Sequence, residues 1–560
     1  MAIARAALLA AAAAVLSLVL VSGGSEADPR TPAALPGLPP PFLGTAVSGD
    51  GGLTAAVDAY GDVVDLRAPG PAGRALIENP SARQAAGTVA ADTGVVPRLR
   101  VGGGPALPLW RADAVRQRYE PGTNVVRTVA FVDGARLVVR TAAAGEWLAM
   151  ELIPRASRER RARAAISVDV GDEVHCARGE RAGALDLLCR VGRALPPVLH
   201  RDARELFRGC DRVFGEAVEG GRRWLGRARG LGAGAPGWAR AMYRRSLLVL
   251  RALTDRRTGA VAAGARDGWA YVWPRDAATA ALAYAAAGYR GEARRVAGFL
   301  SRLGTGIARA ARFDGAGAPV PGRGPQGDAP GWVAVAKRAA YPDTQIVITA
   351  TGWLELPDYR EGSAGTYLAN AIAALGGLPA PAAPAARGPG AAPGALGADG
   401  TKSGRYFTKS AHRRAIVAEF GTARGLVREA GDPSSGLDSA AAWAVRPFSS
   451  PALYPAARRT LLHLAAEATP YGITPGEGWR GGVDPWTAPT AWSAWSLGAL
   501  GERRAALRLL ADLRRAATGA GALPERVDAR TGVPRSTTPL LWSHAFAVLA
   551  LRQLWPKRAA

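Results

Sequence analysis

The hydrophobic pattern of this 560-residue chain changes its period near Ala235. Between Pro41 and about Arg204, short alternating or β-branched runs are interrupted by Gly, Asp and Pro, as in GLTAAVDAYGDVVDLRAPGP from Gly52. That pattern is typical of strands joined by turns. From Ala235 onward, apolar residues recur at the spacing of helices, as in WARAMYRRSLLVLRAL from Trp238. The chain is too long for one ordinary core, so we predict an antiparallel β-sandwich followed by a separate helical domain.

The change of period also sets the expected domain boundaries. We place the sandwich at residues 41–205, a linker at 206–234 and the helical domain at 235–556. Short Gly or Pro breaks separate the helical segments, which predicts stacked helix pairs in either an open solenoid or a closed α/α toroid. No fixed sequence period is present, which argues against repeat arrays of the TPR or HEAT type.

The N-terminus has the pattern of an export signal. Arg5 precedes an apolar run, Ala6 to Val21, and the small residues that follow end in a candidate cleavage site, SEA, at Ala27. The run is slightly shorter than a spanning helix of about 20 residues. We therefore predict that residues 1–27 are a signal peptide, with an uncleaved membrane anchor as the alternative. The protein is expected to be extracytoplasmic, either secreted or associated with the cell envelope, and monomeric.

Three cysteines are compatible with that location. Cys176 and Cys189 flank a stretch that reads as a hairpin, so we predict a disulfide between them, since exported proteins can keep one. Cys210 is then expected to be a free thiol with a structural role.

The formal net charge of +25 does not by itself predict a nucleic-acid partner. Only four of the 71 basic residues are lysines, which indicates a compositional bias toward arginine. The densest basic run, RASRERRARA from Arg155, has no interleaved aromatic residues. We interpret it as a solvated face and expect no nucleic-acid partner.

The residues best equipped for chemistry lie between the predicted helices. Four segments combine acidic residues with aromatic rings, and their members are Trp273, Arg275 and Asp276; Trp353, Glu355, Asp358, Tyr359 and Glu361; Glu477, Trp479, Arg480, Asp484 and Trp486; and Glu525 with Trp542. Each acid taken alone could simply cap a helix. A closed toroid would gather such loops around one mouth. Two carboxylates there, one protonated and one ionised, are the apparatus of glycoside hydrolysis. The five histidines show no metal-ligand spacing, so we predict no metal and no cofactor.

In order along the chain, these segments resemble glycoside hydrolase family 15, the glucoamylase and glucodextranase family. YVWPRD resembles its sugar-binding Trp-x-Arg-Asp motif at Trp273, Arg275 and Asp276, and GRGPQGDAPG resembles a Pro-Gln-x-Asp segment that includes Asp328. PDYREGS resembles the general-acid motif, VDPW an Asn/Asp-Pro-Trp element, and LPERVD with PLLWSHA the general-base segment.

The resemblance implies an (α/α)6 toroid that hydrolyses α-glucosidic bonds of oligo- or polysaccharides from a chain end, with inversion. It assigns Glu361 as general acid and Glu525 as general base. The residues then expected to bind the carbohydrate are Trp273, Arg275, Asp276, Asp328, Asp358, Glu477 and Trp542. An N-terminal β-sandwich also fits the bacterial members of the family.

One position departs from the family pattern. The residue before the acidic Glu is usually Trp, and this chain has Arg360. A cation there would lower the pKa of Glu361, whereas a general acid needs a pKa high enough to keep its proton. Glu355 and Glu477 are therefore kept as alternative acids. A trehalase or other α-glycosidase on the same scaffold is the alternative activity, and a glycan-binding envelope protein with weak catalysis is the alternative that Arg360 favours.

Overall fold

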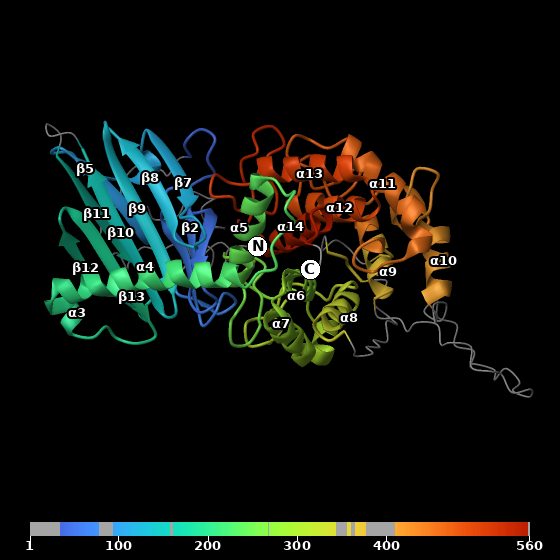
Figure 1. Ribbon diagram of the computed structural model, residues 1–560, viewed down its shortest axis with the longest axis horizontal. Helices are drawn as coiled ribbons and strands as arrows, with labels where there is room; N and C mark the ends of the chain where they lie inside the picture. The colour runs from blue at the N-terminus through green and yellow to red at the C-terminus, as the bar shows by residue number, and fades with distance from the viewer. Residues whose placement is uncertain are drawn as a thin grey trace, which may run out of the picture.

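A computed structural model gives the fold of residues 34–77, 93–156, 161–266, 268–342, 356–359, 365–376 and 409–557. The N-terminal part is a sandwich of two antiparallel sheets, seen at the left of Figure 1. One sheet has the order β1-β2-β3-β5-β11, with β4 on β3 and β6 on β5. Its strands are β1 (Gly44–Gly49), β2 (Thr54–Asp58), β3 (Val63–Ala68), β4 (Arg74–Ala75), β5 (Gly94–Val101), β6 (Ala106–Pro108) and β11 (Ala162–Asp169). The other has the order β12-β13-β10-β9-β8-β7. Its strands are β7 (Ala114–Tyr119), β8 (Val126–Val132), β9 (Ala135–Ala144), β10 (Trp147–Arg155), β12 (Val174–Arg181) and β13 (Ala184–Val191).

The alternating strand sequences account for the sandwich core. Because successive side chains point to opposite faces of a strand, one set from each sheet meets in the space between the sheets. That core includes Leu66, Val95, Leu137, Leu148 and Leu187. The predicted β-sandwich is therefore confirmed.

The disulfide prediction is also confirmed. Cys176 on β12 lies directly opposite Cys189 on β13, and their sulfur atoms are bonded. Cys210 is a buried free thiol on the next long helix.

The segment 206–234, expected as a linker, is mostly helix α4 (Ala203–Gly226), which follows the short helix α3 (Val198–Arg201). Asp202 caps α4 by accepting a hydrogen bond from the backbone N–H of Arg204. The apolar face of α4, which includes Leu206, Val213 and Phe214, packs on the outer face of the β7–β13 sheet. Figure 1 shows α4 running along the sandwich toward the helical domain. The helical period thus begins before the boundary that we expected.

The C-terminal part is a closed ring of helices, at the right of Figure 1. Its inner elements are α6 (Pro274–Ala287), α8 (Ala329–Ala340), α9 (Leu368–Ala374), the 3-10 segment η4 (Ser439–Ala444), α12 (Thr487–Ala499) and α14 (Leu541–Leu554). Each contacts the next, and α14 returns to contact α6. This closure distinguishes a toroid from an open solenoid. Outside it lie α5 (Gly237–Ala252), α7 (Arg290–Leu303), α10 (Lys409–Phe420), α11 (Tyr454–Ala466) and α13 (Arg503–Ala516). The remaining elements are the hairpin β14 (Val427–Glu429) and β15 (Asp432–Leu437), and the 3-10 turns η1 (Leu109–Arg111), η2 (Gly304–Ala308) and η5 (Pro451–Leu453).

The sequence explains which helices are inside. Inner helix α6 reads PRDAATAALAYAAA and is buried on almost every side, as expected for a helix with little charge around its circumference. Outer helix α13 reads RRAALRLLADLRRA and buries mainly one stripe, which includes Leu509, Leu510 and Leu513. Small residues on α6 let its neighbours α8 and α14 approach closely.

The two parts of the molecule share an interface. Val47, Ala56 and Val64 on the first sheet belong to the same apolar core as the toroid helices. Asn124 donates a hydrogen bond to the carbonyl of Leu248 on α5, 3.0 Å away. The outer helix α5 therefore sits between the sandwich and the inner ring.

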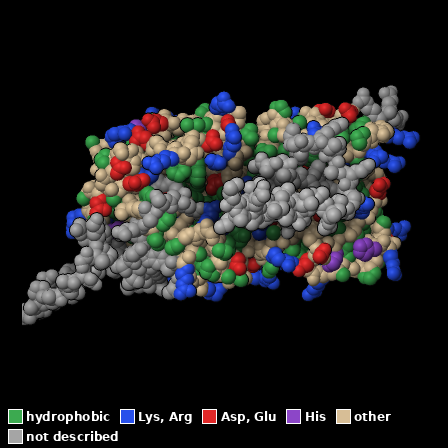
Figure 2. All heavy atoms as spheres, turned by 180° about the vertical axis from the view of Figure 1, so that it is seen from behind, with side chains coloured by type: hydrophobic (Ala, Val, Ile, Leu, Met, Phe, Trp, Pro, Cys, Tyr) green, Lys and Arg blue, Asp and Glu red, His purple; other side chains and the backbone are tan. Residues whose placement is uncertain are grey.

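Charged side chains of both signs lie on the surface. On the face shown in Figure 2, Lys and Arg side chains are scattered among Asp and Glu side chains. Within the described ranges, no helix is both long enough and apolar enough to span a bilayer.

Candidate active site

A pocket opens where several inner helices begin. Its empty volume, open mouth included, is about 880 Å³, within the range of small-molecule sites. The lining residues are Ala263, Trp269, Trp273, Arg275, Asp276, Arg323, Tyr359, Trp486, Glu525, Arg526, Ser536, Leu540 and Trp542. Trp273, Trp486 and Leu540 are the residues immediately before α6, α12 and α14. Ring closure thus brings the loops ahead of three inner helices to one place.

One wall of the pocket is built around Arg275. Its Nη1 donates to Asp328 at 2.9 and 3.2 Å and to the side-chain oxygen of Gln326 at 2.8 Å. Its guanidinium carbon lies 4.6 Å from the ring centroid of Trp542. Asp328 is fully buried and outside the lining, so it holds Arg275 from behind. Paired in this way, the guanidinium is fixed in a dry environment.

Asp276 shares this wall. Its Oδ2 lies 3.8 Å from Arg275 Nε. Burial raises the pKa of Asp276 to about 7; Arg275 opposes the rise, while the charges of Asp328 and Glu525 add to it. Asp358 is buried and near enough to act on Arg275 electrostatically. The acids around this arginine outnumber it, and Asp276 is the one that reaches the pocket.

Glu525 lines the same pocket. Its backbone N–H donates to the carbonyl of Thr537 at 3.0 Å, and its carbonyl accepts from the N–H of Thr487 at 3.0 Å. Ser536 donates a hydrogen bond to Oε2 of the side chain. Desolvation raises the pKa of Glu525, while hydrogen bonds from Ser536 and Trp269 lower it. The carboxylate is therefore held in place, with donors that favour its ionised form.

Aromatic side chains complete the pocket lining. The pocket exposes rings of Trp269, Trp273, Tyr359, Trp486 and Trp542, and such faces stack well on the C–H surfaces of sugars. Fully buried aromatic residues on the inner elements pack behind these rings. They are Trp332, Trp443, Trp492 and Phe546, with centroid distances of 5.1 Å for Trp332–Trp443, 5.4 Å for Trp443–Trp492 and 5.6 Å for Trp492–Phe546. Trp443 and Trp492 also contact the pocket-lining rings of Tyr359 and Trp542, so the aromatic lining is continuous with the core.

The residues expected at a site fall into groups. Trp273, Arg275, Asp276, Glu525 and Trp542 line the pocket together. Asp328 and Asp358 lie buried behind its wall. Glu361, the alternative acid Glu355, and the neighbouring Arg360 and Trp353 lie outside the described residues.

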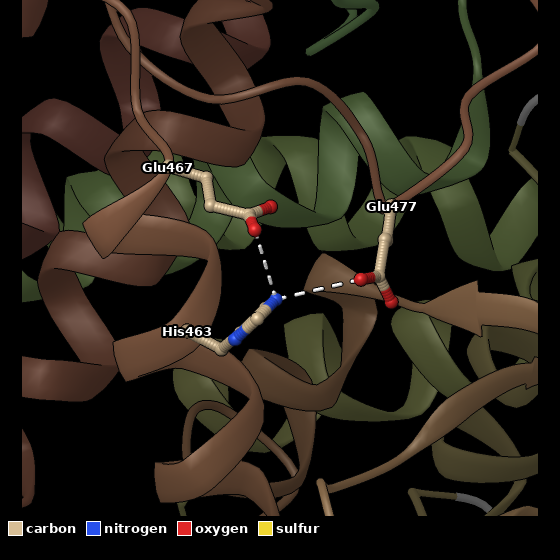
Figure 3. A group of neighbouring side chains, drawn as sticks. All are labelled: His463, Glu467 and Glu477. Carbon is tan, nitrogen blue, oxygen red and sulfur yellow. Dashed lines mark ion pairs between the residues drawn. The ribbon is translucent and has the colours of Figure 1, made fainter.

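Glu477 lies elsewhere, in the cluster drawn in Figure 3. Its carboxylate accepts from Arg424 at 2.6 Å and lies 3.4 Å from His463 Nε2, which is also 3.2 Å from Glu467. Hydrogen bonds from Arg424 lower the pKa of Glu477. The group His463, Glu467 and Glu477 brings three possible metal ligands together, but Arg424 Nη2 lies 2.9 Å from His463 Nε2 and so occupies the approach of a cation. Glu477 thus serves an ion-paired surface cluster and lies outside the pocket lining.

Sequence reasoning missed several lining residues, including Ser536, Arg323 and Arg526. Ser536 reaches Glu525 because the chain folds back over the turn Asp528–Gly532, where the Asp528 N–H donates to the carbonyl of Val533. The Asp and Gly residues of DARTG are a turn signal that could have predicted this hairpin. Arg323 and Arg526 carried no comparable local signal.

Comparisons with known proteins agree with this geometry. The sequence profile described as Glycosyl hydrolases family 15 matches residues 237–310. A crystal structure of bacterial glucoamylase complexed with acarbose is similar over 95% of this chain and 96% of that chain, with a TM-score of 0.68 and 13% sequence identity. Two further structures are similar over more than half of this chain. A wild-type glycosidase has a TM-score of 0.43 and 19% identity, and the match covers 57% of this chain and 99% of that one. Glucoamylase from Saccharomycopsis fibuligera has a TM-score of 0.42 and 13% identity, and the match covers 58% of this chain and 97% of that one. The search of curated proteins found no match. The fold is that of the bacterial glucoamylase over nearly the whole chain, and the segment 237–310, which contains Trp273, Arg275 and Asp276, is similar to glycosyl hydrolases of family 15.

Proposed function

We propose that this glycoside hydrolase removes terminal glucose from α-linked oligo- or polysaccharides by inversion, as a glucoamylase does. The observation that carries the proposal is that Glu525 lines the same pocket as Arg275 and Asp276. Glu525 offers a carboxylate able to activate water, and Arg275 and Asp276 offer fixed hydrogen-bonding groups for sugar hydroxyls. The similar bacterial glucoamylase was solved with acarbose, which supports a carbohydrate ligand for this pocket.

The packed interior of the helical ring favours attack at a chain end. Trp332, Trp443 and Trp492 come from three different inner elements, are fully buried and contact one another, which supports a blind pocket rather than a passage between the described helices. A non-reducing end can enter and place its last ring against Trp542, Arg275 and Asp276. Release of single terminal units follows from this shape.

The proposed chemistry uses two carboxyl groups. Glu361 donates a proton to the glycosidic oxygen as the bond to the anomeric carbon breaks. Glu525 takes a proton from a water molecule that attacks the same carbon from the opposite face, so the configuration inverts. An inverting pair needs about 6.5–9.5 Å between its carboxyl groups to admit that water. Tyr359, two positions before Glu361 in the sequence, lines the pocket, which supports this assignment.

The alternative acids are weaker candidates. A general acid must hold its proton near the working pH, and the pairing with Arg424 lowers the pKa of Glu477. Glu477 also lies outside the pocket lining. We therefore give Glu477 no part in catalysis or sugar binding, and keep Glu355 as the alternative to Glu361.

We propose an extracytoplasmic location for the protein, as a monomer. The apolar run Ala6–Val21 has the character of an export signal, with a membrane anchor as its alternative. The disulfide between Cys176 and Cys189 supports an oxidising compartment.

The proposal is tested by substrate range and stereochemistry. Purified protein is incubated with maltooligosaccharides, dextran and trehalose, and sugar release is followed with proton NMR during the first turnovers. We expect glucose from an α-linked oligosaccharide, released first as the β-anomer. Initial α-anomer would overturn the inverting mechanism, preference for trehalose would favour the trehalase alternative, and binding of maltose without turnover would favour a glycan-binding protein. Glu525→Gln serves as the control for contaminating activity.

A further inference from the structure

Hydrogen bonds hold the loop segment Leu523–Glu525 in place. The Leu523 carbonyl accepts from the N–H of Leu540 at 2.8 Å, and the backbone groups of Glu525 are bonded to Thr537 and Thr487. Two partners of this segment are side chains of inner helices. Thr487 at the start of α12 donates its hydroxyl to the Pro524 carbonyl, and His544 on α14 accepts from the Leu523 N–H at 2.9 Å.

The tautomer of His544 follows from these contacts. A backbone N–H can only donate, so Nε2 of His544 is the unprotonated nitrogen. The proton of the neutral ring is then on Nδ1, which lies 2.9 Å from Ser246 Oγ. Both side chains are fully buried. Burial, with a smaller contribution from Arg245, lowers the pKa of His544 to about 3, so the ring stays neutral at ordinary pH and both hydrogen bonds persist.

Ser246 connects this contact to the rest of the molecule. It lies on α5, where the neighbouring Arg245 donates to Asn124 of the sandwich at 3.0 Å, and Asn124 in turn donates to Leu248 of α5. The imidazole therefore connects the helix that meets the sandwich with the loop segment that ends in Glu525.

We propose that His544 is a positioning residue for Glu525, holding the segment Leu523–Glu525 by its bond to the Leu523 N–H while Ser246 fixes the imidazole. The inference rests on the proposed role of Glu525 as the base. His544 lies outside the pocket lining, so its effect passes through the placement of the carboxylate. A displacement of about 1 Å in a catalytic group costs roughly 10²-fold in rate, so loosening this segment lowers turnover without weakening sugar binding.

Two substitutions separate the two ring nitrogens. In His544→Gln, the side-chain amide reaches roughly the position of Nε2 and can accept the hydrogen bond from the Leu523 N–H. In His544→Asn, the shorter side-chain amide reaches roughly the position of Nδ1 and can hydrogen-bond only to Ser246. Both variants replace the imidazole by an amide in the same buried place, so thermal unfolding reports the structural loss that they share. Ser496→Ala is the matched control. Ser496 lies on the inner helix α12, is fully buried, and donates a hydrogen bond to the Ala442 carbonyl at 2.7 Å.

We expect kcat to fall roughly 10- to 100-fold in His544→Asn and to stay within about threefold of wild type in His544→Gln. KM should not change in either, because Arg275 and Asp276 are untouched. The acidic limb of the kcat/KM profile should move to higher pH in His544→Asn, since a displaced Glu525 loses its bonds from Ser536 and Trp269. Ser496→Ala should keep wild-type kinetics.

Equal loss of kcat in both His544 variants, or no loss in either, would overturn the positioning role. If His544→Asn does not fold, Ser246→Ala is compared with Ser496→Ala instead. Ser246→Ala should lower kcat severalfold, and Ser496→Ala should not. Equal kcat in these two variants would contradict the proposal. Glu525→Gln is measured in parallel. Full turnover in that variant would mean that the proposed function has failed, whereas its inactivity with an unimpaired His544→Asn would mean that only the positioning role has failed.

Discussion

The Glu525 wall of the pocket and the surface cluster around Glu477 are built from similar pieces and behave in opposite ways. Each glutamate lies in a loop ahead of an inner helix, near arginine and tryptophan residues. Glu525 lines a pocket and has its pKa raised by desolvation. Glu477 is paired with Arg424 and has its pKa lowered. Local composition therefore does not decide which acid can do chemistry; the surroundings that ring closure supplies do.

The largest expected difference is in turnover. Glu525→Gln should reduce kcat by about 10²- to 10⁴-fold, the usual worth of a general base. Glu477→Gln is the same substitution in the other loop, and it should leave kcat and KM unchanged. Steady-state hydrolysis of a maltooligosaccharide measures both. Comparable losses in the two variants would show that the two loops do not differ in function.

Sugar affinity should depend on the part of the pocket formed by Arg275 and Asp276. Asp276→Ala removes a charged hydrogen-bonding partner, which is worth about 1.5–3 kcal/mol or roughly 10- to 150-fold in Kd. Calorimetric titration with maltose in the Glu525→Gln background avoids hydrolysis during the measurement. The same titration with Glu477→Gln added to that background should give an unchanged Kd. Unaltered affinity in Asp276→Ala would remove Asp276 from the binding site.

The pocket and the Glu477 cluster should also differ in how pH affects stability. Burial raises the pKa of Asp276 from 3.8 to about 7, so the folded protein binds a proton that the unfolded chain has released between these values. Wild type should therefore lose stability relative to Asp276→Asn as pH rises from about 4 to about 7, by at most about 1.4 kcal/mol per pH unit. Chemical denaturation of both proteins across this range measures the difference. A constant difference would mean that Asp276 does not titrate there.

The sequence predicted the parts of this comparison that depend on local pattern. The helical period predicted the helices, and the motifs around Trp273 and Glu525 identified residues that do meet in one pocket. The pairing of Glu477 was not predicted because its partner Arg424 is 53 residues away along the chain, and no local signal indicates such a pair. The sequence also gives no sign of the role of His544, since a neutral ring that accepts from a backbone N–H has no sequence signature. The pairing of Glu477 and the contacts of His544 both depend on residues that ring closure brings together, and local sequence patterns do not encode such contacts.

A smaller effect is expected from the hydroxyl that supports Glu525. Ser536 donates to the carboxylate and so lowers the pKa of Glu525 against the effect of burial. In Ser536→Ala that pKa should rise, and the acidic limb of kcat/KM should move to higher pH with a loss of only a few-fold at the optimum, because a single neutral hydrogen bond is worth about 1 kcal/mol. A pH–rate profile of the two proteins checks the shift. An unmoved limb would mean that this bond does not favour the ionised base.

The smallest effect is expected in the Glu477 cluster, and its pH dependence has the opposite sign to that of Asp276. Arg424 lowers the folded pKa of Glu477 below the ordinary value of 4.5, so the pair stabilises the fold above pH 4.5 and the contribution disappears as pH falls through the lowered pKa. Wild type should therefore unfold at a slightly higher temperature than Glu477→Gln near pH 6, and the gap should close in acid. Since the side chain of Arg424 is 57% exposed, salt screens the pair, and a salt concentration of about 1 M NaCl should also close the gap. Calorimetric scans near pH 6 with and without salt, and again near pH 3, test both statements. A difference in unfolding temperature that widens in acid would contradict the expected sign. A difference that persists in high salt would mean that Glu477 stabilises the loop through its backbone, whose N–H donates to the Leu437 carbonyl, and not through its charge.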